Sequence, residues 1–64
     1  MSEIDMDKQL RKAKQLHDDL LRADKAEEAE YVLALGIIML TDAKSGHPRP
    51  WKDYLPRYHE EFGL

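Results

Sequence analysis

The sequence predicts an all-α protein: a helical hairpin followed by a short third helix near the C-terminus, with two copies pairing into a homodimer of the four-helix-bundle type. Three observations support this prediction. Apolar residues recur at helical spacing in the first third of the chain, aromatic residues do so in the last third, and the run Tyr31–Leu40 (YVLALGIIML) carries no charge. A strand through this run is disfavoured, because few of its residues are β-branched and no other segment offers a partner strand.

A first helix is expected from about Asp5 to Arg22. Ser2 and Asp5 have the spacing of a capping box, which satisfies free amide groups at a helix start. Mostly apolar side chains then alternate by four and three residues, and charged side chains occupy the opposite face. The alternating set is Met6, Leu10, Ala13, His17 and Leu20, widened by Leu16 and Leu21.

Acidic residues interrupt the apolar pattern after Arg22. Asp24 followed by Glu27 is typical of a new helix start, where the helix dipole favours acids. We therefore place a tight turn at about 23–25 and a second helix from about 26 to 44, ended by Gly46 and Pro48. The alternative is one continuous helix over 5–44, about 60 Å long, which would leave the apolar run with too little cover.

The last third of the chain, residues 47–64 (called the tail below), is expected to belong to the same domain as the hairpin of residues 1–46. Its first residues, HPRP, are expected to be extended, because each proline restricts the residue before it. A short third helix is expected from about 54 to 62. The aromatic and apolar residues that recur at four-three-four spacing are Trp51, Leu55, Tyr58 and Phe62.

The apolar run also predicts self-association. A helix through it is apolar on every side and must be covered on every side, whereas one hairpin partner covers about a third to a half of its circumference. Short chains often complete such a core by oligomerisation. The expected contact residues are Tyr31, Leu35, Ile38 and Met39, with His17 from the first helix. His17 either fixes the register in the seam or lies at the stripe's margin with a local hydrogen bond.

Composition limits the classes of function. The chain has 64 residues, a net charge of -3 and no cysteine, which excludes disulfides and thiolate metal sites. The N-terminus lacks the apolar core of a signal peptide, and the apolar run is about half as long as a membrane span. A cytoplasmic protein without a membrane partner is expected.

Enzyme signals are nearly absent. Ser45 and His47 lie in a Pro/Gly loop that is most simply a helix end, and it lacks the strained turn of a nucleophile elbow. The segment His59-Glu60-Glu61 has no second histidine four residues further on, as a zinc-binding helix would need. We therefore expect no enzymatic activity, no metal and no cofactor.

Two clusters are candidates for contact with a partner. The sequence favours a small non-enzymatic regulatory protein, an adaptor or an inhibitor of the antitoxin kind found among short bacterial and phage proteins, which binds another protein. The alternative is a nucleotide- or RNA-binding protein, because mixed cations and aromatic rings also suit stacking and phosphate contact. The clusters are Arg49, Trp51, Lys52, Tyr54, Arg57, Tyr58 and His59 in the tail, and the basic face Lys8, Arg11, Lys12 and Lys14. For the tail's aromatic residues, the competing interpretation is that they cover the core.

Overall fold

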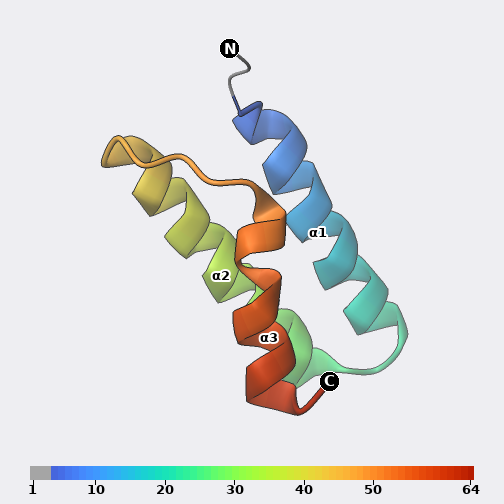
Figure 1. The fold of residues 1–64 in the computed structure, drawn as a ribbon. Helices are drawn as coiled ribbons and strands as arrows, with labels where there is room; N and C mark the ends of the chain where they lie inside the picture. The colour runs from blue at the N-terminus through green and yellow to red at the C-terminus, as the bar shows by residue number, and fades with distance from the viewer. Residues whose placement is uncertain (1–3) are drawn as a thin grey trace.

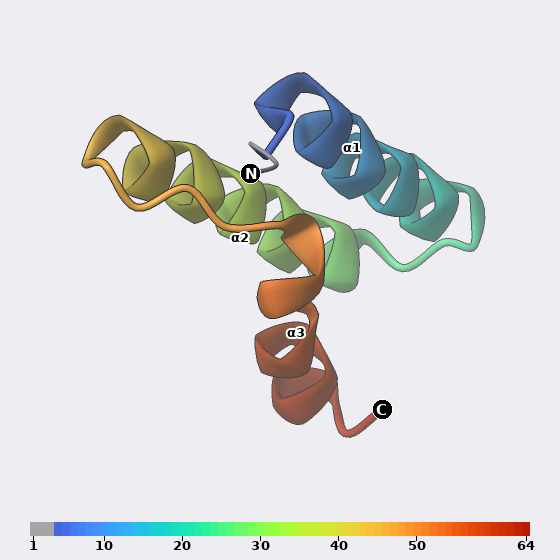
Figure 2. The ribbon, with the colours of Figure 1, turned by 45° about the horizontal axis from the view of Figure 1, so that its top comes forward.

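The computed structural model describes residues 4–64 and contains helices but no strand in that range, which confirms the all-α prediction. Helix α1 spans Met6–Arg22, α2 spans Ala26–Lys44, a 3-10 turn η1 spans Trp51–Asp53, and α3 spans Leu55–Phe62. Helices α1 and α2 form an antiparallel pair, and η1 and α3 lie against one side of it (Figure 1, Figure 2). The alternative of one continuous helix is therefore wrong.

The break between α1 and α2 occurs without glycine or proline because Asp24 adopts the left-handed conformation, at φ 61°. Aspartate tolerates this region better than most residues. The backbone N–H groups of Asp24 and Lys25 donate to the carbonyls of Leu21 and Leu20, at 3.1 and 2.8 Å. Asp24 thus ends α1. The expectation that it starts α2 is wrong, since Lys25 holds that position without a side-chain cap.

The other helix ends follow the sequence signals more closely. Asp5 caps α1, and its carboxylate accepts the N–H of Lys8 at 3.3 Å. Ser2, the other half of the expected capping box, lies outside the described residues. Gly46 follows α2 at φ 88° and Gly63 ends α3 at φ 68°, both conformations that favour glycine.

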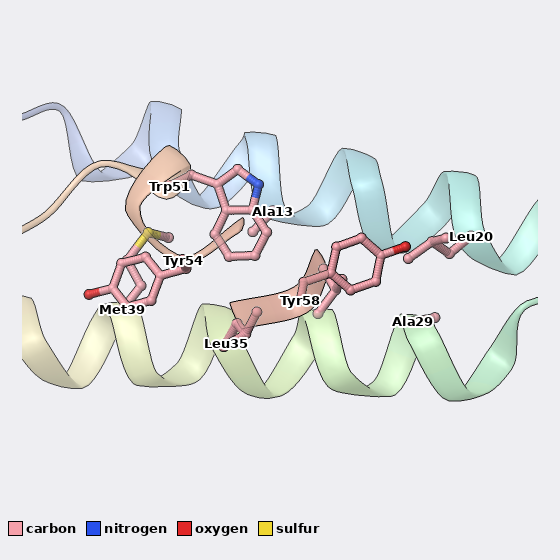
Figure 3. Packing of buried hydrophobic residues seen from close by; sticks show 9 residues of the cluster. Ala13, Leu20, Ala29, Leu35, Met39, Trp51, Tyr54 and Tyr58 are labelled. Atoms are coloured by element: carbon pink, nitrogen blue, oxygen red, sulfur yellow. The ribbon is translucent and has the colours of Figure 1, made fainter. Parts of the chain in front are cut away.

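The core lies where the tail meets the helix pair. Val32, Leu35 and Met39 of α2 are almost completely buried. The rings of Trp51, Tyr54 and Tyr58 lie between α1 and α2 in Figure 3, and all three are buried as well. The tail therefore covers one side of the hairpin and completes its core. The 3-10 turn that carries Trp51 was not predicted from the sequence.

Three hydrogen bonds connect the tail to the helix pair. The backbone N–H of Trp51 donates to Gln9 Oε1 at 2.7 Å, in a buried position. The Tyr54 hydroxyl donates to Asp42, and the Tyr58 hydroxyl donates to Glu28, both at 2.5 Å. Each end of the tail is thus anchored to a different helix by a polar contact as well as by packing.

Replacing Gln9 with leucine should destabilise the protein by about 1–3 kcal/mol, because the buried Trp51 N–H would lose its only acceptor within the described residues. The matched control is Gln15→Leu on the same helix, since Gln15 is exposed and its amide donates to Asp19 at the surface. Thermal melts followed by circular dichroism measure both. Equal melting temperatures for the two variants would show that this contact contributes little.

Candidate protein-contact surfaces

An apolar groove with a volume of about 490 Å³ lies between α1 and α2. All of its lining residues come from these two helices, so the tail leaves it open. From α1 they are Leu10, Ala13, Lys14, His17 and Asp18; from α2 they are Val32, Leu33, Gly36, Ile37 and Leu40.

Two large apolar side chains on the α2 wall of the groove face solvent. Leu33 is 54% exposed and Ile37 is 58% exposed. With Gly36 and Leu40 they occupy positions i, i+3, i+4 and i+7, which form one continuous stripe on a helix. Apolar side chains that are clustered in this way are typical of protein-contact surfaces.

The α1 wall of the groove is more polar. The Lys14 ammonium lies 2.8 Å from Asp18 Oδ2, and the ring nitrogen Nδ1 of His17 lies 3.2 Å from Asp18 Oδ1. These contacts hold the pKa of the Asp18 carboxyl below its usual value, with the hydrogen bond to Lys14 as the largest cause and that to His17 as the second. His17 thus lies at the groove with a local hydrogen bond, as in the second interpretation of this residue. Its role in fixing a register stays a prediction.

The residues expected in self-association lie mostly elsewhere in the structure. Leu35 and Met39 are buried inside the subunit, and Tyr31 packs edge-on against Phe62 with ring centroids 5.6 Å apart. Ile38 is 38% exposed but does not line the groove. A helix that is apolar on all sides has no polar face to mark the solvent side, so the sequence could not show which side of α2 faces inward. Leu33, Ile37 and Leu40 are the outward residues that sequence reasoning missed.

The tail cluster divides into buried and exposed members. Trp51, Tyr54 and Tyr58 are buried, which favours the interpretation that they cover the core. The exposed members are Arg49, Lys52, Arg57 and His59. Both arginines lie close enough to the Tyr54 hydroxyl to oppose the rise of its pKa. Two cations of the tail therefore lie near the Tyr54–Asp42 contact with α2.

The burial of these rings bears on the nucleotide alternative. A base stacks on an exposed aromatic face. The rings of Trp51 and Tyr54 instead stack on each other inside the core, with their centroids 6.2 Å apart. The basic face of α1 is exposed at Lys8, Arg11, Lys12 and Lys14, and Lys14 is already paired with Asp18. Trp51, Tyr54 and Tyr58 thus offer no open ring face to a base, and the exposed cations belong to a chain of net charge -3.

Comparison of the chain with protein families, curated proteins and solved structures found no match. Within residues 4–64, no three His, Asp or Glu side chains gather in a way that could hold a metal ion. In the same range, no helix combines the length and the apolar content that crossing a bilayer requires.

Proposed function

We propose that this protein is a small non-enzymatic adaptor or inhibitor that acts as a homodimer by binding another protein. The observation that carries this proposal is the open apolar groove on an otherwise highly charged chain, in which 36% of residues are charged. Leu33 and Ile37 remain more than half exposed there. A surface of this kind gains free energy only when another macromolecule covers it.

The exposed cations of the tail are the surface that we propose for the partner. Arg49, Lys52 and Arg57 project from a segment that is anchored by Trp51 and Tyr54. A rigid segment loses little conformational entropy on binding, which favours affinity. The positive side chains match an acidic partner surface, and electrostatic complementarity raises the rate and specificity of association.

The double variant Arg49→Glu/Arg57→Glu should lose the protein partner that the wild-type chain retains. Tagged protein is used for affinity capture from the source cells, with and without nuclease, and bound proteins are identified by mass spectrometry. Circular dichroism confirms that the variant is folded. The matched control is Lys8→Glu/Lys12→Glu on the exposed basic face of α1.

Loss of capture with the control pair alone would move the partner surface to α1. Loss of all captured proteins on nuclease treatment would favour the RNA-binding alternative over the proposed function. Capture that is unchanged in both double variants would exclude both basic surfaces.

A further inference from the structure

The stripe on the open side of α2 is self-complementary. Its order along the helix is Leu33, Gly36, Ile37 and Leu40, so that reading it backwards gives the same pattern with glycine and isoleucine exchanged. Gly36 forms a hollow: a Cβ atom built there would meet only the Cβ atom of Ala13, at 3.7 Å. Ile37, directly beside the hollow, is the most exposed large apolar side chain in the helices.

We infer that the groove is filled by the groove of a second copy of this chain, with α2 packed antiparallel against the partner's α2. In this arrangement Ile37 of each copy fills the hollow at Gly36 and Ala13 of the other, and Leu33 faces Leu40 of the partner subunit. The pairing is isologous, as two-fold dimers require. The inference rests on the proposed function, because it takes the groove to be a working contact surface.

The available area fits this occupant. Helices α1 and α2 have 17 and 19 residues, which makes them about 26 and 28 Å long at 1.5 Å per residue. A standard interface buries about 800 Å² per partner. That is about a sixth of this chain's 4780 Å² of accessible surface. The face formed by two such helices side by side supplies an area of this order.

The difference in polarity between the two walls of the groove favours packing of α2 on the partner's α2 rather than on its α1. Leu33, Ile37 and Leu40 would meet only apolar groups, whereas stacking α2 on the partner's α1 would bury them against the charged Lys14 and its neighbour His17. Desolvating the Lys14–Asp18 ion pair is costly. Antiparallel α2 helices also place their dipoles in the favourable orientation.

Sedimentation equilibrium over a concentration series tests the occupant. The wild-type chain should be a dimer, and Ile37→Glu should raise the dissociation constant about a hundredfold or more, since each interface would bury two unpaired carboxylates. The matched control is Ala34→Glu, which places the same charge at an exposed position of α2 outside the groove. Its dimer should persist. Circular dichroism verifies that both variants remain helical.

Filling the hollow tests the contact without adding charge. In Gly36→Ala the added Cβ fits its own subunit, because the nearest atom, the Cβ of Ala13, lies at an ordinary van der Waals distance of 3.7 Å. Alanine also favours the helix more than glycine does. We expect the isolated subunit to retain its helical spectrum while the dimer dissociation constant rises at least tenfold. An unchanged constant would show that the hollow is not in the interface.

Cysteine crosslinking tests the register, and the chain has no cysteine of its own to interfere. A mixture of Leu33→Cys and Leu40→Cys proteins should form disulfide-linked heterodimers under mild oxidation. Leu33→Cys alone should crosslink poorly, because its two copies would lie about 10 Å apart along the helix axis, beyond the roughly 7 Å that a disulfide spans between Cα atoms.

Efficient crosslinking of Leu33→Cys to itself would overturn the antiparallel register. A wild-type chain that stays monomeric at high micromolar concentration would overturn the inference as a whole. In that case partner capture that depends on Arg49 and Arg57 would still support the proposed binding of another protein, so the two failures can be told apart.

Discussion

A chain truncated after Gly46 should be unfolded at 25 °C. The truncation removes the buried rings of Trp51, Tyr54 and Tyr58 and exposes the side of α2 that they cover. Losing one buried aromatic side chain costs about 3–5 kcal/mol. A chain of this length has a total stability of roughly 3–10 kcal/mol at the usual 0.05–0.15 kcal/mol per residue. The free energy lost with three rings therefore exceeds the total stability of the fold.

Far-UV circular dichroism and thermal melting measure this effect. A chain shortened only by Leu64 is the matched control, since that residue is 66% exposed and should be dispensable for cooperative unfolding. The single variant Trp51→Ala gives the intermediate case, with an expected loss of about 3–5 kcal/mol. A cooperative melt of the chain ending at Gly46 would contradict the role of the tail as part of the core.

The helices themselves could be predicted from local signals. The expected bounds of 5–22, 26–44 and 54–62 differ from those found by no more than one residue at each end. Asp5, Gly46 and Gly63 mark ends because caps and left-handed conformations depend on local chemistry. Such signals depend on a few neighbouring residues, so they are readable without knowledge of the tertiary structure.

The direction in which each helix faces was harder to predict. In α1 two stripes overlap: Gln9, Ala13 and Leu20 are buried, while Leu10 and His17 line the groove. The alternating set found in the sequence contains residues of both the buried stripe and the groove stripe. The burial of Gln9 was not predicted, because a buried amide has meaning only once its partner is known. Trp51, which is 42 residues away, supplies that partner.

The candidate contact surface was missed for the same reason. The sequence indicated that α2 needs more cover than one hairpin partner provides, and the structure still leaves Leu33 and Ile37 exposed. Which side stays open depends on where the tail packs, and Tyr54 and Tyr58 determine this through Asp42 and Glu28. These are contacts over 12 and 30 residues, which periodicity within one helix cannot show.

Raising the pH from 10 to 12 should destabilise this protein through the same two tyrosines. Burial raises the pKa of Tyr54 to about 12, and the hydrogen bond to the Asp42 carboxylate adds to this rise. Burial and the Glu28 carboxylate do the same for Tyr58, whose pKa is also about 12. In the unfolded chain both phenols ionise near pH 10. The unfolded state therefore releases protons first, and it is favoured as the pH rises.

The stabilisation is fully present below about pH 10 and is lost as the pH rises through 12, by at most about 1.4 kcal/mol per pH unit for each tyrosine, less where solvent screens the carboxylates. Urea unfolding at a series of pH values measures this loss.

The variant Tyr54→Phe/Tyr58→Phe should be less stable at pH 8, because it lacks two hydrogen bonds. It should nevertheless lose less stability than the wild type between pH 10 and 12. Tyr31→Phe is the matched control, since no hydrogen bond from its hydroxyl is found within residues 4–64. If the double variant and the wild type lose stability equally over that range, alkaline unfolding has another cause, and the two phenols do not anchor the tail through their protons.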